Sequence, residues 1–77
     1  MKILFFGRLG DTIGREIDFE LPEGGCTVAE LRAALAKSHA GLAAESVRAC
    51  IDHEIAPESA LVLPSHEIAF IPPLSGG

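Results

Sequence analysis

The residues around position 27 give the clearest structural signal in the chain, the start of a helix. Pro22-Glu23-Gly24-Gly25 interrupts any regular element. Thr27-Val28-Ala29-Glu30 then forms a capping box, in which the Thr27 hydroxyl and the Glu30 carboxylate satisfy orphan backbone amides reciprocally. The apolar positions at helical spacing are Val28, Leu31, Ala34 and Leu35, whereas Glu30, Arg32 and Lys37 fall outside this face. We therefore predict one amphipathic helix that ends before Gly41 and packs on one apolar surface.

Two strand patterns precede this helix. Residues 2–9 are almost continuously apolar, which is typical of a strand at the centre of a sheet. Residues 16–21 alternate polar and apolar side chains and predict an amphipathic strand antiparallel to the first. The glycine-bearing connection over residues 9–15 is expected to turn, with a helical turn around Thr12 and Ile13.

Three further strand patterns follow the helix. Residues 47–52 alternate, His53-Glu54 is expected to form a tight turn, and Ile55 opens a short return strand. Residues 67–71 form a last apolar strand, which Pro72-Pro73 ends because proline cannot donate to a ladder.

The order of these elements predicts the fold. The two most apolar strands, the first and the last, should lie side by side and parallel at the centre. This is an α+β fold, the ubiquitin-like β-grasp: a mixed sheet of four to five strands crossed by one main helix. A chain of 77 residues forms a single core, so we assign residues 1–71 to the domain and residues 72–77 to a flexible C-terminal Gly-Gly tail.

Charge and hydropathy argue against several classes of function. The net charge is −5, from eleven acidic and six basic residues with no basic cluster, so nucleic acid and anionic membranes are poor partners. Such a chain should instead be steered toward a positively charged partner surface. No apolar run is long enough for a membrane span, and the start does not resemble a signal peptide, so we expect a cytoplasmic protein.

Side-chain chemistry also has little support. Cys26 and Cys50 are not in a C-x-x-C pattern and are expected to be buried or half-buried thiols. The three histidines lack metal-ligand spacing, so no metal site is expected. A core this small leaves little volume for a substrate cavity, which argues against an enzyme that works on its own. Function should lie on the surface or at an end.

The C-terminal sequence Pro72-Pro73-Leu74-Ser75-Gly76-Gly77 is the best candidate for the functional group. A terminal Gly-Gly arises by chance about once in two hundred chains, given the usual glycine content. The prolines favour an extended exit, and the last four residues can then reach roughly 13–14 Å. Glycines lack a Cβ and can pass through a narrow channel. The pattern predicts delivery of the Gly77 carboxylate into the active site of a partner.

A carboxylate is unreactive until it is activated. The most plausible activation is a mixed anhydride with AMP, and attack by sulfur then leaves a thiocarboxylate. This sulfur is a softer and stronger nucleophile than oxygen, and a site that excludes water can use it for sulfur transfer.

The chain resembles a known family over its whole length. The strand-turn-strand-helix order, Phe5-Phe6 and the ending from Phe70 through Pro72-Pro73 to Gly77 resemble the small subunit of molybdopterin synthase, the MoaD-type sulfur carrier of the MoaD/ThiS family. Such carriers often have an Asp-Gly turn before the final strand, where this chain has Pro64-Ser65-His66. The geometry of that turn is therefore open.

The resemblance implies a cycle with several partners. A ubiquitin-activating-type enzyme uses ATP to adenylate Gly77, and a sulfurtransferase or cysteine desulfurase supplies the sulfur. The tail, Pro72 to Gly77, then enters the large catalytic subunit, where the thiocarboxylate donates sulfur to cyclic pyranopterin monophosphate for molybdenum cofactor biosynthesis. Two carriers and two large subunits would form a heterotetramer. The carrier holds no permanent cofactor, only covalent sulfur.

The resemblance also implies a docking patch of Phe6, Ile55 and Ile71. Ile3 and Phe5 should lie on one face of the first strand and Leu4 and Phe6 on the other. Because one helix can cover only one face, apolar side chains should stay exposed on the second, although each patch residue is equally open to a packing role.

Three other functions fit the same sequence. These are a carrier for thiamine or another thiolated product, a ubiquitin-like modifier conjugated to lysines, and an interaction module with an incidental tail. Partner genes, isopeptide-linked species and the effect of removing Gly76 and Gly77 would separate these functions.

Overall fold

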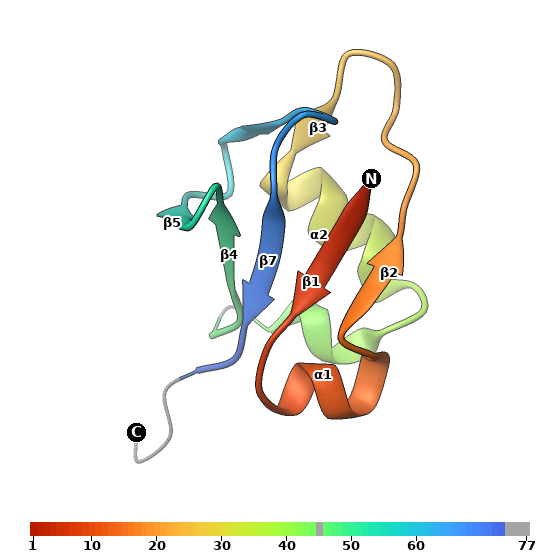
Figure 1. Cartoon of the computed structure of the whole chain (residues 1–77), viewed down its shortest axis with the longest axis vertical. Helices are drawn as coiled ribbons and strands as arrows, with labels where there is room; N and C mark the ends of the chain where they lie inside the picture. Colours follow the sequence, from red (N-terminus) through yellow and green to blue (C-terminus); the bar gives the residue numbers. More distant parts are fainter. Residues whose placement is uncertain (45, 74–77) are drawn as a thin grey trace.

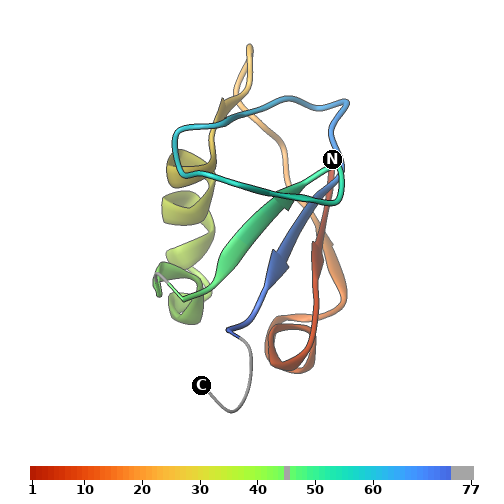
Figure 2. The ribbon, with the colours of Figure 1, turned by 90° about the vertical axis from the view of Figure 1, so that its left-hand side faces the viewer.

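The computed structural model describes residues 1–44 and 46–73. Its elements are β1 (Lys2–Phe5), α1 (Arg8–Ile13), β2 (Glu16–Asp18), β3 (Cys26–Thr27), α2 (Val28–Ala36), the 3₁₀ helix η1 (Ala40–Ala43), β4 (Arg48–Ile51), β5 (Glu54–Ala56), β6 (Leu61–Val62) and β7 (Ile68–Ile71). A five-stranded sheet has the order β2-β1-β7-β4-β5, and β3 pairs with β6 in a separate two-stranded sheet. Helix α2 crosses one face of the larger sheet (Figures 1 and 2).

The centre of the sheet confirms the predicted topology. β1 and β7 are parallel neighbours, with Ile3 opposite Ile68 and Phe5 opposite Phe70. β2 pairs antiparallel with β1, and β4 pairs antiparallel with β7. The fold is therefore the mixed, helix-crossed sheet of a β-grasp. The division between residues 1–71 and the tail stays a prediction, because Leu74 to Gly77 lie outside the described residues.

The first strand is shorter than the apolar run predicted. β1 ends at Phe5, and Gly7 turns the chain with φ 57° and ψ −137°, a combination that favours glycine. Helix α1 then replaces the single helical turn that was expected. Leu9 and Ile13 lie four positions apart on this helix and both pack against the core. Their burial explains why the apolar pattern continued past the strand.

The second strand is also shorter than its pattern, because β2 ends at Asp18 rather than Leu21. The alternation continues in the packing, since the apolar side chains of Ile17, Phe19 and Leu21 contact the core while their neighbours are exposed. The Phe19 amide donates to the Met1 carbonyl at 2.9 Å, which extends the contact with the start of β1.

The turn between β4 and β5 lies one residue earlier than predicted, at Asp52-His53 instead of His53-Glu54. Both turn residues have positive φ, 50° and 72°, as a two-residue hairpin turn of this kind requires. The Asp52 carboxylate accepts a hydrogen bond from the Glu67 amide, and the Asp52 amide donates to the Glu67 carbonyl, both at 2.8 Å. This pair of bonds fixes the turn at Asp52.

The turn before β7 is closed by its histidine. The Leu63 amide donates to His66 Nδ1 at 3.0 Å, and the His66 amide donates to the Leu63 carbonyl at 2.9 Å. The imidazole thus serves a local structural role in the segment where related carriers often have Asp-Gly.

The capping box at the start of α2 is confirmed. The Thr27 amide donates to Glu30 Oε1 at 2.8 Å, and the Glu30 amide donates to the Thr27 hydroxyl at 3.1 Å. The helix ends at Ala36, before Gly41 as expected. Val28, Leu31 and Leu35 are buried against the sheet.

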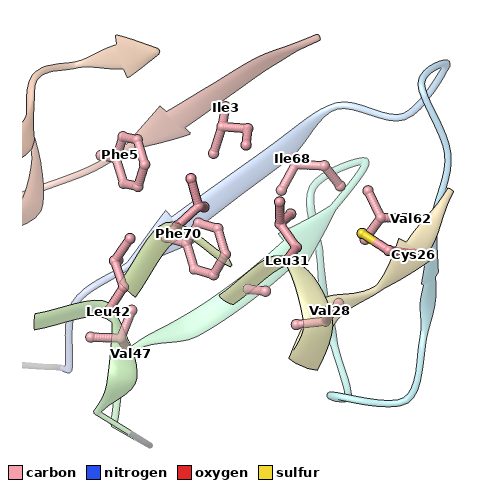
Figure 3. Close-up of a cluster of buried hydrophobic side chains, with 12 residues drawn as sticks. Ile3, Phe5, Cys26, Val28, Leu31, Leu42, Val47, Val62, Ile68 and Phe70 are labelled. Carbon is pink, nitrogen blue, oxygen red and sulfur yellow. The ribbon is translucent and has the colours of Figure 1, made fainter. Parts of the chain in front are cut away.

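The core lies between α2 and the inner face of the sheet (Figure 3). Phe70 is fully buried, and its ring stacks on that of Phe5 with the centroids 5.9 Å apart. The other buried apolar side chains around this pair are Ile3, Cys26, Val28, Leu31, Leu35, Leu42, Val47, Ala49, Val62 and Ile68.

Arg32 lies outside the apolar face predicted for the helix, and yet it is buried. Its guanidinium makes two hydrogen bonds of 2.9 Å to the Glu58 carboxylate and donates to the carbonyls of Leu42 and Ala44. It also lies 5.6 Å from the centroid of the Phe70 ring. A charge can be buried here because its donors are satisfied by an opposite charge and by backbone oxygens.

The glycines before α2 allow a matched test of backbone geometry. Gly24 and Gly25 both have φ +83°, but a Cβ on Gly25 would overlap the carbonyl oxygen of Val62, whereas one on Gly24 would meet nothing within 4 Å. We expect Gly24→Ala to lower the unfolding free energy by about 1 kcal/mol, the cost of a left-handed conformation. Gly25→Ala should cost about 3 kcal/mol, because β6 must also shift.

Urea denaturation of the two variants would measure this difference. Equal losses for Gly24→Ala and Gly25→Ala would contradict the predicted close approach of Gly25 to β6.

Candidate functional site

The candidate site begins where β7 leaves the sheet. Pro72 is half-buried, Pro73 is exposed, and a Cβ on Gly7 would lie only 2.8 Å from Pro72 Cγ. The Phe6 amide donates to the Phe70 carbonyl at 3.1 Å. The connection between β1 and α1 therefore packs against the exit of the last strand. Figure 1 shows this exit at the end of the sheet that carries α1.

The reactive group itself is not described by the structure. Leu74, Ser75, Gly76 and Gly77 lie outside the described residues, so the roles assigned to them remain predictions. What the structure adds is the position from which the tail departs, a central strand with neighbours on both sides.

The face of the sheet opposite α2 carries the predicted docking residues. The register places Leu4 opposite Ala69, Cys50 opposite Ala69 and also opposite Ile55, so all four lie on this outer face. Ile71 lies two positions after Ala69, and Phe6 lies two positions after Leu4, so the alternation of a strand places both on the same outer face. We call this set the outer apolar face: Leu4, Phe6, Cys50, Ile55, Ala69 and Ile71.

The three predicted patch residues differ in exposure and position. Phe6 is 51% exposed and Ile55 61% exposed, whereas Ile71 is half-buried. Phe6 and Ile71 lie at the ends of the adjacent strands β1 and β7, beside the tail exit. Ile55 lies on β5 at the edge of the sheet, with β4 between it and β7. The structure therefore brings Phe6 and Ile71 together and places Ile55 on the same face at a distance.

Sequence analysis missed part of this face. Leu4 and Phe6 line a hollow of about 320 Å³ that extends between β1, α1 and the start of β2. Cys50 was treated only as a packing residue, although the alternation of residues 47–52 places it on the outer face with Arg48. Leu61 is 51% exposed as well, but it lies on β6 in the separate two-stranded sheet.

The cysteines are thiols in ordinary packing positions. Cys26 is buried and Cys50 half-buried, as predicted, and both are free. Burial, with a further contribution from the Glu30 carboxylate, raises the pKa of the Cys26 thiol. Because sulfur chemistry requires the thiolate, this shift makes Cys26 a poor nucleophile near neutral pH.

Metal binding and membrane insertion find no structural support in the described part of the chain. Within residues 1–44 and 46–73, His, Cys, Asp and Glu side chains form no group of three or more that could hold a metal ion. His53 instead lies 3.2 Å from Glu67. None of the helices described is long and apolar enough to cross a membrane.

The fold defines a small ubiquitin-like protein of the β-grasp class. A family model assigns it further: the model of the ThiS family matches residues 3–77, and the chain belongs to that family. Among the curated proteins, no match to this chain was found.

Solved structures agree with the fold. SAMP1 from Haloferax volcanii is 22% identical with a TM-score of 0.71, and the match covers 99% of this chain and 97% of that one. A structure described as molybdopterin converting factor, subunit 1, from Pyrococcus furiosus is 21% identical with a TM-score of 0.79, over 95% of each chain. A second structure of small archaeal modifier protein 1 of H. volcanii is 20% identical with a TM-score of 0.70, over 95% of each chain.

Proposed function

We propose that this chain is the sulfur carrier subunit of molybdopterin synthase. The observation that carries the proposal is the junction of a central strand with Pro72-Pro73 and a Gly-Gly ending, beside an exposed apolar face, in a member of the ThiS family. The likeness to the P. furiosus protein described as a molybdopterin converting factor subunit supports this branch of the family. The carrier is not an enzyme on its own; its large partner subunit supplies catalysis.

The proposed chemistry takes place at Gly77. In an adenylating partner, the terminal carboxylate attacks the α-phosphorus of ATP, and pyrophosphate leaves. A persulfide from a sulfurtransferase or cysteine desulfurase then attacks the acyl carbon and expels AMP. Reduction of the remaining S–S bond by a thiol releases the thiocarboxylate. The thiocarboxylate sulfur then bonds to cyclic pyranopterin monophosphate in the large subunit, and water hydrolyses the acyl–sulfur bond, which leaves the sulfur on the pterin and returns the carrier to the carboxylate form.

The described residues support this role by positioning. Gly7 packs against Pro72 and so constrains the start of the tail. Phe6 and Ile71 flank the same exit, where a partner that holds the tail would also contact them. The domain thus offers an apolar docking face next to the segment that enters the partner.

Intact mass is the first test. We expect the full chain, incubated with an adenylating partner, ATP and a sulfur donor, to gain the mass of one oxygen-to-sulfur exchange at its C-terminus. A chain that lacks Gly77 serves as the control and should gain nothing. Sulfur transfer to cyclic pyranopterin monophosphate by the large subunit then tests the acceptor. Absence of the mass gain with a competent partner would contradict the carrier function.

A second candidate function is conjugation to proteins. It is favoured by the likeness to SAMP1, which covers 99% of this chain and carries the name of a modifier protein. It predicts isopeptide-linked species in cells that disappear when Gly77 is deleted. A carrier for thiamine or another thiolated product shares the thiocarboxylate and differs in the acceptor, so it would pass the mass test and fail the pterin assay.

A further inference from the structure

The basic side chains are distributed unevenly over the fold. Of the six basic residues, Lys2 pairs with Glu16 at 3.2 Å and Arg32 with Glu58 at 2.9 Å. The other four are Arg8, Arg15, Lys37 and Arg48, and all four are exposed. None of them forms an ion pair with another residue of the described part of the chain.

Three of these residues lie, by the position of their backbone, at the end of the sheet from which β7 exits. Arg8 directly follows Gly7, the residue that approaches Pro72. The Arg15 carbonyl accepts a hydrogen bond of 2.9 Å from the Phe5 amide, which places it at the end of β1. Arg48 is opposite Ile71 in the β4–β7 register. We call Arg8, Arg15 and Arg48 the arginine collar. Lys37 follows the C-terminal end of α2, which Figure 2 shows at the same end of the fold.

Acidic side chains gather at the other end of the sheet. The Asp52 carboxylate accepts a hydrogen bond from the amide of Glu67, which lies just before β7 begins. Glu54 follows Asp52 in the β4–β5 hairpin. Glu20 and Glu23 follow Phe19, which pairs with Met1 at the start of β1. Near the exit, Asp11 lies on α1, Glu16 is paired with Lys2, and Glu45 lies outside the described residues. The far end of the central strands therefore carries mainly acidic side chains, whereas the tail end carries the four exposed basic side chains together with Asp11 and Glu16.

This charge distribution bears on whether the partner surface that receives the tail is positively or negatively charged. β1 and β7 each have four residues, so the two ends of the sheet are about 13 Å apart. The Debye length is about 8 Å at physiological ionic strength. The acids at the far end are therefore screened from a surface that receives the tail, and the charges near that surface are the arginine collar, Asp11 and Glu16. The net charge of −5 predicted a positively charged partner. The charge near the tail differs from this sum over the whole chain.

Building on the proposed function, we infer that the adenylating partner presents carboxylates around the mouth of the channel that receives the tail, and that the arginine collar binds them. The phosphates of ATP are a less suitable target. The four residues beyond Pro73 can span roughly 13–14 Å. A nucleotide bound at the C-terminus is therefore farther from the arginine collar than one Debye length, and its interaction with the collar is screened. The collar contacts the rim of the channel and aligns the tail with its mouth.

The test uses two variants with the same change in net charge. The collar variant is Arg8→Gln, Arg15→Gln and Arg48→Gln; the control is Ala29→Glu, Ser59→Glu and Ser65→Glu, all exposed positions away from the exit. The probe is the ubiquitin-activating-type adenylating enzyme of the same organism, with stopped-flow association measured at low and high salt. We expect the collar variant to associate about tenfold more slowly at low salt, the control less than twofold, and the difference to disappear at high salt.

Two results would overturn the inference: equal association rates for the two variants, or faster association of the collar variant, as a positively charged partner would give. The yield of adenylate at a saturating enzyme concentration tests the proposed carrier function independently of the association rate. Normal yield in all three proteins together with equal association rates would refute the collar and leave the carrier function standing.

Discussion

Phe6→Asp will lower affinity for the adenylating partner by about thirtyfold or more while the melting temperature stays close to that of the wild type. Phe6 is 51% exposed, so its replacement removes little core packing. It also lies beside the tail exit, where a partner would bury it, and truncation of a central apolar anchor costs about 2 kcal/mol or more. An aspartate adds the cost of burying a charge. Calorimetric titration and thermal denaturation measure the two quantities.

Leu61→Asp is the matched control for this change. Leu61 is also 51% exposed, but it lies on β6, outside the outer apolar face. We expect its replacement to leave the affinity unchanged. Equal losses in the two variants, or unchanged affinity for Phe6→Asp, would show that the outer apolar face is not the docking surface.

Phe70→Ala will lower the unfolding free energy by about 3–5 kcal/mol, the usual range for truncation of a buried aromatic residue. The Phe70 ring is fully buried, stacks on Phe5 and lies under the Arg32 guanidinium. Its loss leaves a cavity and removes a contact that helps to offset the burial of Arg32. Because small domains are marginally stable, this loss is a large part of the total unfolding free energy. Urea denaturation monitored by circular dichroism provides the measurement.

Phe19→Ala is the comparison for Phe70→Ala. Phe19 is half-buried at the margin of the core, so the same truncation should cost clearly less. A Phe70→Ala variant no less stable than Phe19→Ala would contradict the central role assigned to the Phe70 ring.

Local signals in the sequence were sufficient for much of the fold. The capping box at Thr27 and Glu30 lies within four residues and needs no tertiary contact. The parallel pairing of β1 with β7 followed from their apolar composition, because only a central strand is buried by neighbours on both sides. Burial of Arg32 could not be predicted in this way, since its partner Glu58 is 26 positions away and no local pattern joins them.

The candidate site shows the same division. The Pro-Pro and Gly-Gly pattern is visible in the sequence because it depends on neighbouring residues. The arginine collar is not visible in the sequence, because Arg8 on α1, Arg15 just before β2 and Arg48 on β4 reach the same end of the fold only when the sheet is assembled. The strand ending at Phe5 was also missed, since Leu9 and Ile13 on α1 continue the apolar pattern that a strand would show.

The central position of β7 has a mechanical consequence. β7 is held by hydrogen bonds to β1 on one side and to β4 on the other, and it leads directly to Pro72. A pull along the tail therefore loads both ladders in shear, so that their hydrogen bonds resist together, whereas an edge strand peeled sideways would lose them one at a time. A force applied at the C-terminus is thus resisted by the two hydrogen-bond ladders at the centre of the sheet.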